Sequence, residues 1–251
     1  CDSCILPEYT RITGRPQLPP KWSFGLWMSK CSYSSQNEVL DIAKKLRENR
    51  IPCDVINIDL WHNYDFRFTE DFPDPSGMAG KLADNGFKLS LWQHPYLIKG
   101  TKIYEEAERK GYLALAEDNK PYGDIGIIDL TSNEAVDWYK NVIKGLLDMG
   151  ASVIKVDFGE AADENAIYKG ISQDEIHNVY PLLYNKALFE ITEKVYGKGS
   201  GIIWARSAYA GSQRYPLHWS GDTTANFGHL QAVLRSGLQS GLSGFVFWSH
   251  D

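Results

Sequence analysis

Short apolar runs alternate with longer segments of helical periodicity along most of this chain. The apolar runs predict strands, and they cover 24–29, 55–60, 88–94, 152–160, 201–207, 218–222 and 244–251. Helical spacing of apolar residues fills the segments between them: 36–49, a segment with Met78 and Leu82, 102–110, one opened by Thr131 and Glu134, one from Ser172 to about Val195, and 230–238. Strands that alternate with helices predict a parallel sheet, and seven repeats favour a closed barrel over an open doubly wound sheet.

Two segments fall outside this alternation. Residues 1–22 contain Pro7, Pro16, Pro19 and Pro20 between polar spacers, which predicts an extended lead-in to a barrel domain that covers 23–251. A long insertion of about 100–131 follows the third strand, and its part 111–129 predicts a loop with a hairpin. Because no eighth strand follows 244–251, the expected fold is a (β/α)8 TIM barrel truncated before its eighth strand.

The strand at 152–160 carries two charges. Alternation places Val153, Lys155 and Asp157 on one face of this strand, and the other face is apolar. Burying charges costs several kcal/mol per ion unless they are paired or used, so this pattern predicts either an ion pair that fixes the packing or a functional site. Asp157 stands at the end of the strand, the edge where a barrel holds its active site, which favours the second interpretation.

Composition and charge narrow the classes of function. The 251 residues include 26 Lys and Arg against 32 Asp and Glu, with a formal net charge of -6, which argues against nucleic acid and membrane surfaces as partners. The four cysteines are too irregularly spaced to predict a disulfide framework or a zinc site, and glycine motifs that bind nucleotide phosphates are missing. No apolar run approaches roughly 20 residues and no leader opens the sequence, so a cytoplasmic location is expected.

Polar or hydrogen-bonding side chains recur at the predicted strand ends. They are Asp59, Trp92, His94, Asp157, Arg206, Asp222, His250 and Asp251. Converging carboxylates suit two chemistries, which are Mg²⁺ binding and glycoside cleavage by a pair of carboxyl groups. Lys155 favours an ionised Asp157 and competes with a metal, and nearby aromatic residues suit the apolar face of a sugar, so glycoside cleavage is favoured.

Several motifs in one order carry a resemblance to a known family. They are Lys155-Val-Asp157-Phe-Gly-Glu160, Ala205-Arg206-Ser207, His218-Trp-Ser-Gly-Asp222 and Phe247-Trp-Ser-His250-Asp251, preceded by the segment 11–27. Together they resemble the catalytic barrel of glycoside hydrolase family 31 over essentially the whole chain. The resemblance implies a retaining α-glycoside hydrolase that uses no metal and no cofactor, with flanking β-sandwich domains that are absent from this sequence.

The resemblance also implies roles for single residues. Asp157 matches the family's nucleophile, and Asp222 matches its general acid/base. Asp59 matches the carboxylate that holds sugar hydroxyls in the −1 subsite, which binds the sugar that is cleaved off. Further residues of that subsite are matched by Trp92, Lys155, Phe158, Arg206, Trp219 and His250.

The sugar is suggested by the residues around the nucleophile. Lys155 before it and Phe158-Gly-Glu160 after it resemble the α-xylosidase branch, whereas α-glucosidases carry Trp-x-Asp-Met-Asn-Glu. Asp59-Leu60-Trp61 replaces the Asp-Cys-Phe of the best-known α-xylosidases, so Leu60 and Trp61 are expected beside the pocket. A pocket can select a pentose by filling the space of the hexose hydroxymethyl group, and Trp61 is expected to fill it.

The expected mechanism is double displacement on a terminal, non-reducing α-linked sugar. Asp157 attacks the anomeric carbon while Asp222 donates a proton, and Asp222 then activates water; the two carboxyl groups should lie about 5 to 6 Å apart. Lys155 is expected to keep Asp157 ionised, and partial burial to favour the protonated form of Asp222. The alternatives are an α-glucosidase, an α-glycosyltransferase and, in another class, a Mg²⁺-dependent barrel enzyme. The expected partner is a small carbohydrate, and homo-oligomer formation stays open.

Overall fold

A single curled parallel sheet organises the molecule. The computed structural model describes residues 2–250, so Asp251, at the end of the last predicted strand, lies outside the described residues. The sheet has seven strands in the order β1-β2-β3-β6-β7-β8-β9. Their bounds are β1 (Trp27–Lys30), β2 (Val55–Ile58), β3 (Lys88–Gln93), β6 (Ala151–Val156), β7 (Ile203–Ala205), β8 (His218–Trp219) and β9 (Trp248–Ser249).

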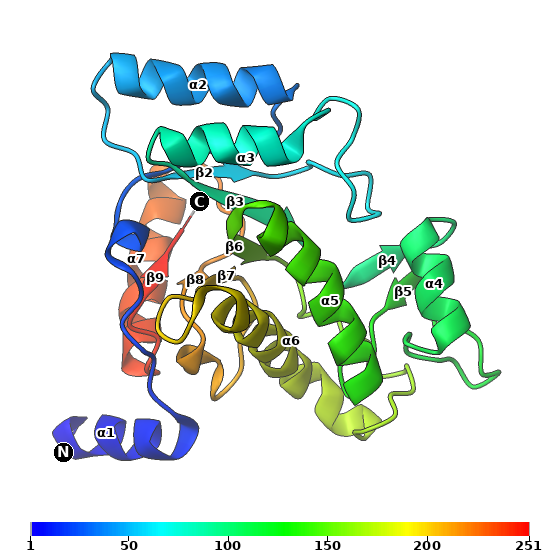
Figure 1. Ribbon diagram of the computed structural model, residues 1–251. Helices are drawn as coiled ribbons and strands as arrows, with labels where there is room; N and C mark the ends of the chain where they lie inside the picture. Colours follow the sequence, from blue (N-terminus) through cyan, green and yellow to red (C-terminus); the bar gives the residue numbers. More distant parts are fainter. Residues whose placement is uncertain (1, 251) are drawn as a thin grey trace.

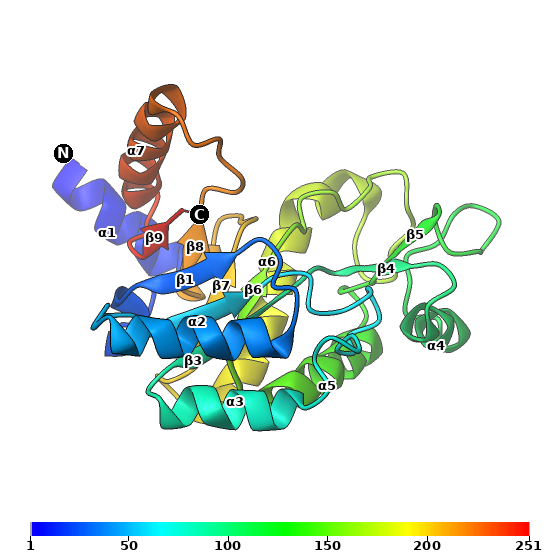
Figure 2. The same ribbon diagram turned by 90° about the horizontal axis from the view of Figure 1, so that it is seen from above.

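Each of the seven predicted runs overlaps one of these strands, which confirms the barrel architecture. All pairs in the sheet are parallel, and spatial order follows chain order, as in a barrel rather than in a doubly wound sheet. The sheet curls so that its two edge strands, β1 and β9, approach one another (Figure 2). The Phe24 and Phe247 rings, which precede these strands, lie 5.9 Å apart between centroids.

Helices follow the strands and cover the outer face of the sheet (Figure 1). They are α2 (Gln36–Glu48), α3 (Pro75–Asp84), α5 (Asn133–Met149), α6 (Gln173–Tyr196) and α7 (Phe227–Leu242). Local chemistry fixes their starts: the Ser35 side chain accepts a hydrogen bond from the amide of Glu38, and Asp74 does the same for Gly77. Such caps stabilise a helix by about 1 kcal/mol each.

The capping box predicted at Thr131 and Glu134 is wrong by one residue. The N-cap of α5 is Ser132, whose hydroxyl donates to Glu134, whereas the Thr131 hydroxyl donates to Asp129. Asp129 precedes the helix and accepts hydrogen bonds from both the amide and the hydroxyl of Thr131, so Thr131 belongs to the loop.

The insertion after β3 forms a small lobe beside the sheet. It contains β4 (Tyr96–Ile98), α4 (Lys102–Lys110) and β5 (Ile125–Ile127), and β4 pairs with β5 in antiparallel fashion. Both views place this lobe on the side of the molecule opposite α7 (Figures 1 and 2). The hairpin expected within 111–129 is present as antiparallel bridges, Leu113 with Ile128 and Leu115 with Pro121, and β5 pairs in addition with β4, which precedes this segment.

The extended conformation predicted for 1–22 is also wrong, because α1 (Asp2–Thr13) is helical, η1 (Lys21–Phe24) is a 3-10 helix, and 14–20 between them forms neither helix nor strand. Pro7 lies inside this helix, where it removes a single backbone donor. Neighbouring side chains stabilise the turn around it: Arg11 pairs with Glu8, and the Thr13 hydroxyl donates to the Tyr9 carbonyl. One proline among residues of helical propensity therefore did not prevent a helix.

Candidate active site

Asp157 directly follows β6, and three nitrogen donors contact its carboxyl group. The Trp92 indole Nε1 donates to its Oδ2 at 2.6 Å, and the Arg206 Nη1 lies 3.0 Å from its Oδ1. The backbone amide of Phe158 also donates to Oδ1, at 2.8 Å. The Asp157 residue is 7% exposed, so this carboxyl group is oriented and largely removed from solvent.

The loop after Asp157 is fixed by contacts to β4 and to the segment that follows β7. Phe158 has a positive φ of 57°, which turns the chain out of the strand. The Tyr96 hydroxyl accepts hydrogen bonds from the amides of Gly159 and Ala161, and the Ser207 hydroxyl donates to the Phe158 carbonyl at 2.6 Å. A Cβ atom on Gly159 would lie 2.7 Å from the Ser207 Oγ, so glycine is required there.

Burial raises the pKa of Asp157 above its ordinary value, and this effect is opposed by its partners. The hydrogen bond from Trp92 and the charge of Arg206 are the largest influences that lower this pKa, and Lys155 is the smallest. Lys155 therefore acts in the expected direction, but its influence on this pKa is the smallest of these. Trp92 and Arg206 are closer to the carboxylate and carry most of that effect.

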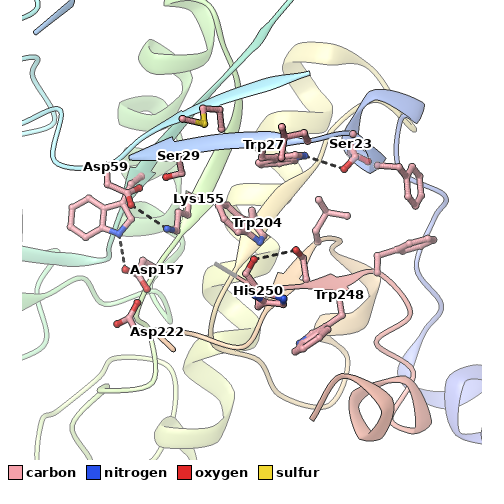
Figure 3. Close-up of a pocket in the computed structure, with 18 of the residues that line it drawn as sticks. Ser23, Trp27, Ser29, Asp59, Lys155, Asp157, Trp204, Asp222, Trp248 and His250 are labelled. Carbon is pink, nitrogen blue, oxygen red and sulfur yellow. Dashed lines mark hydrogen bonds and ion pairs between the residues drawn. The ribbon is translucent and has the colours of Figure 1, made fainter. Parts of the chain in front are cut away.

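The ion-pair partner of Lys155 is Asp59, which directly follows β2. Its Nζ lies 3.2 Å from the Asp59 Oδ2, and the Asn57 amide donates to the other oxygen at 2.9 Å (Figure 3). The ammonium group also lies over the Trp204 and Trp219 rings, 4.8 and 5.2 Å from their centroids. The buried ammonium group therefore has one carboxylate partner and two cation–π contacts among these residues.

Arg206 connects Asp157 with Asp222. Its Nη1 lies 3.5 Å from the Asp222 Oδ2, and its Nε donates to Glu160 at 2.9 Å. Since one nitrogen contacts an oxygen of each aspartate, at 3.0 and 3.5 Å, the two oxygens lie no farther apart than the sum of these distances. In inverting enzymes the two carboxyl groups lie about 6.5 to 9.5 Å apart, and the limit excludes the wider separations in that range. The partial burial expected for Asp222 is wrong, because its side chain is 85% exposed.

A cavity of about 930 Å³ lies between these residues and the two edge strands (Figure 3). Seven of the predicted site residues line it: Asp59, Trp92, Lys155, Asp157, Phe158, Asp222 and His250. Three do not, namely Trp61, Arg206 and Trp219. The volume falls in the range of small-ligand sites, about 300 to 1,000 Å³.

The contact expected between Trp61 and a sugar is wrong. Trp61 is fully buried, and its indole N–H donates to the Trp92 carbonyl at 2.6 Å, so it supports Trp92 from behind. Leu60, with a positive φ of 49°, faces the cavity instead and is 46% exposed. Trp219 is likewise buried, in contact with Trp204, so it cannot line the pocket directly as expected.

Other residues at the cavity were not predicted. Trp27 and Ser29 of β1 and Trp204 of β7 line it, and the Trp27 and Trp204 rings lie 5.2 Å apart. Strand alternation was the available signal, because Trp204 stands two residues before Arg206 and therefore on the same face. Glu160, the last residue of the motif around Asp157, pairs with Arg206.

Neither a metal-ligand cluster nor a membrane-spanning helix is found within the described residues. Within 2–250, no three His, Cys, Asp or Glu residues are grouped so that they could hold a metal ion. Over the same residues, no helix combines the length and the apolar character needed to cross a membrane.

Comparison with known proteins places this arrangement in a family. Residues 16–251 match the family model described as the TIM-barrel domain of glycosyl hydrolases family 31. The chain is 36% identical to α-xylosidase XylQ of Lactiplantibacillus pentosus and 34% identical to an α-xylosidase of Emericella nidulans, over 98% of its own length in both cases. It spans about a third of these relatives, 34% of each.

A solved structure agrees with these relatives. The family 31 dextranase of Flavobacterium johnsoniae, in complex with glucose, superposes with a TM-score of 0.93 at 29% identity, over 100% of this chain and 34% of the dextranase. More distant relatives are named as α-glucosidases and as an isomaltosyltransferase. The fold, the order of the motifs and the match over nearly all residues agree, and the chain therefore belongs to glycosyl hydrolase family 31.

Proposed function

We propose that the protein containing this chain is a retaining α-glycoside hydrolase that removes a terminal, non-reducing α-linked sugar. The observation that carries this proposal is the pair of aspartates joined by Arg206 at the cavity, one buried and one exposed. In a retaining enzyme one carboxylate attacks the anomeric carbon and the other carboxyl group exchanges protons. Asp157 is the proposed nucleophile, and Asp222 is the proposed general acid/base.

The surroundings of each aspartate support this division of roles. Asp157 receives two hydrogen bonds and faces a guanidinium group, which orients the carboxylate and favours its ionised form. Asp222 is open to solvent, which supplies the water that it deprotonates in the second step, and that proton restores its acid form. The charge of Arg206 between them shields one carboxylate from the other.

The proposed substrate is a small α-xyloside. Lys155 and Phe158, which the sequence shares with the α-xylosidase pattern, both line the cavity, and the relatives reported above at 34% and 36% identity are α-xylosidases. Asp59, held by Lys155 and Asn57, presents a carboxylate for sugar hydroxyls. With Trp61 behind Trp92, Leu60 is the side chain proposed to occupy the space of a hexose hydroxymethyl group.

Two alternatives within the family keep the same aspartates. An α-glucosidase would differ in the sugar that the cavity accepts, and an α-glycosyltransferase would pass the glycosyl group to a sugar instead of water. The Mg²⁺-dependent alternative is less favoured, because the carboxylates of Asp59 and Asp157 already face Lys155 and Arg206.

The whole protein tests the proposal on nitrophenyl α-xyloside, α-glucoside and α-galactoside. We expect the xyloside to be cleaved with the highest kcat/KM and proton NMR to detect α-xylose as the first product. First release of β-xylose would overturn the retaining mechanism, and preference for the glucoside would overturn the sugar assignment. A rate unchanged in excess EDTA would remove the Mg²⁺ alternative, and an added acceptor sugar that captures the glycosyl group would identify a transferase.

A further inference from the structure

The lobe that follows β3 contacts the loop that follows β6, residues 157–172, at several points. Leu115 of the lobe and Ile167 of the loop exchange two backbone hydrogen bonds, at 2.7 and 3.0 Å. The Tyr122 hydroxyl of the lobe donates to Asp163 of the loop at 2.9 Å. The insertion that interrupts the barrel pattern is therefore joined to the segment that begins with the proposed nucleophile.

One residue of β4 reaches the turn directly after the nucleophile. The Tyr96 hydroxyl accepts hydrogen bonds from the amide of Gly159 at 3.2 Å and from that of Ala161 at 3.1 Å. Tyr96 is itself held by strand pairing with Ile127 of β5 and by a hydrogen bond from its amide to the Nδ1 of His94. One hydroxyl oxygen, fixed by a separate small sheet, therefore anchors two donors of the same turn.

The two anchored amides flank the residue that links this turn to the guanidinium group. Glu160, between them, accepts a hydrogen bond from the Arg206 Nε at 2.9 Å, and the Nη1 of the same arginine lies 3.0 Å from the Asp157 Oδ1. The amide of Phe158, also in the turn, donates to that oxygen at 2.8 Å. Both contacts to this carboxylate oxygen therefore come from the turn or from its partner.

We propose that Tyr96 is a positioning residue, which holds the 158–161 turn and thereby sets the two contacts that orient the Asp157 carboxylate. This inference rests on the proposed function, because it takes Asp157 as the nucleophile. Tyr96 does not line the main cavity, so it acts through the turn rather than on the sugar. β6 ends at Val156, and the lobe thus supplies an anchor for backbone that lies beyond the sheet.

The first test removes the hydroxyl of Tyr96 and keeps its ring. Tyr96→Phe retains the ring contacts with Phe158 and His94, and the whole protein is assayed on the nitrophenyl α-glycoside. We expect kcat to fall about tenfold, since two hydrogen bonds that hold the turn are lost. KM should change by less than about twofold, because no contact with the sugar is removed.

The pH profile supplies a readout that a loss of packing alone would not move. The charge of Arg206 and the hydrogen bond from the Phe158 amide both lower the pKa of Asp157. Weaker contacts in Tyr96→Phe should therefore raise this pKa and move the acidic limb of kcat/KM to higher pH. The charged groups around this carboxyl group are Arg206, Lys155, Glu160 and Asp222.

The matched control removes a tyrosine hydroxyl at the opposite end of the same strand. The Tyr196 hydroxyl, at the end of α6, donates to the carbonyls of Leu147 and Ala151, and Ala151 is the first residue of β6. Tyr196→Phe should leave kcat and the acidic limb unchanged. Equal losses of kcat in the two variants, or an unmoved limb in Tyr96→Phe, would overturn the positioning role.

A last measurement needs no turnover and separates this inference from the proposed function. Hydrogen exchange of the 158–161 amides is followed by mass spectrometry of peptic fragments. We expect exchange about tenfold faster in Tyr96→Phe than in the wild type, and no change in Tyr196→Phe. Unchanged exchange in Tyr96→Phe would overturn the inference. Failure of the wild-type protein to cleave the glycoside would instead refute the proposed function, and the exchange rates would still decide whether Tyr96 holds the turn.

Discussion

We call the carboxyl ends of the strands the active edge of the sheet. Asp157 lies at its buried end and Asp222 at its exposed end, and the two differ in how completely the chain surrounds them. At β3, β6 and β7, the Asp157 side chain is 10% exposed and is held by Trp92, Arg206 and the Phe158 amide. After β8, the Asp222 side chain is 85% exposed and contacts Arg206 at 3.5 Å. The comparison teaches that the folded core already sets the environment of one carboxyl group, whereas the other is placed by a loop and a single cation.

The helices show the same contrast. The apolar faces of α2 and α5 are buried, as Val39, Leu46 and Ile143 illustrate. On α7, large apolar side chains at helical spacing are 55–86% exposed: Phe227, Leu230, Leu234, Leu238 and Leu242. The described residues therefore complete the packing around Asp157 and leave the helix that follows Asp222 partly uncovered.

The largest expected effect is the loss of the buried aspartate. Asp157→Ala should lower kcat for the nitrophenyl glycoside by about 10⁴-fold or more, because no other group can form the covalent intermediate. Added azide should restore some turnover and give a glycosyl azide of inverted configuration, since it attacks the substrate directly. Activity near that of the wild type, or a rescued product of retained configuration, would show that Asp157 is not the nucleophile.

Replacing the exposed aspartate should have a smaller effect that depends on the leaving group. Asp222→Ala should lower kcat/KM by about 10² to 10⁴-fold on a disaccharide, whose leaving oxygen needs a proton. The loss should be much smaller on a nitrophenyl glycoside, whose leaving group departs as the anion, and azide should give a product of retained configuration. Equal losses on both substrates would contradict the role of acid/base catalyst.

The Lys155 pair tests how far the buried end depends on charge. Lys155→Met keeps most of the side-chain volume and removes the ammonium beside Asp59, so the free energy of unfolding should fall by about 2 to 3 kcal/mol. Lys155→Met/Asp59→Asn should recover part of this loss. Urea unfolding followed by tryptophan fluorescence measures both.

The matched control for this pair lies on the surface. Lys144→Met removes the exposed partner of Asp148 and should change the free energy of unfolding by less than about 0.5 kcal/mol. If Lys155→Met cost no more than this control, the buried pair would be irrelevant to stability. The same conclusion would follow if the double variant were less stable than Lys155→Met alone.

The sequence predicted the parts of the fold that depend on local pattern. Each of the seven apolar runs overlaps one of the seven strands, and Lys155 in β6 and Asp157 directly after it are both buried. The family resemblance then assigned Asp157, Asp222 and Arg206 to one site, and in the structure Arg206 contacts both aspartates. Their catalytic roles stay predictions.

The failures arise where the local pattern does not determine the contact. Leu60 and Trp61 were both expected beside the pocket, but with a positive φ at Leu60 only Leu60 lines the cavity and Trp61 lies in the core. Lys155 pairs with Asp59, which is 96 residues away in sequence, instead of with the aspartate two residues away. β3 lies between β2, which Asp59 follows, and β6, which carries Lys155, so this contact depends on the register and curvature of the sheet, which the sequence of one strand does not specify.

The finest test concerns one hydrogen bond at the buried end. Trp92→Phe keeps an aromatic ring against His62 and His94 and removes the N–H that donates to Asp157. Burial already raises the pKa of Asp157, and this hydrogen bond is the largest influence that lowers it. Its loss should therefore raise that pKa further. Because the nucleophile reacts as the carboxylate, the acidic limb of the profile of kcat/KM against pH should move to higher pH.

The loss of rate should then depend on pH in a defined direction. Below the limb, kcat/KM of Trp92→Phe should fall about tenfold relative to the wild type, and the deficit should shrink as the pH rises and Asp157 ionises in both proteins. Trp61→Phe is the matched control, because it removes a buried indole N–H that donates to the Trp92 carbonyl and not to a carboxylate, so its limb should not move. If the acidic limb stayed in place in Trp92→Phe, or moved equally in both variants, the environment of Asp157 would not depend on this hydrogen bond. The contrast between the buried Asp157 and the exposed Asp222 would then lose its main support.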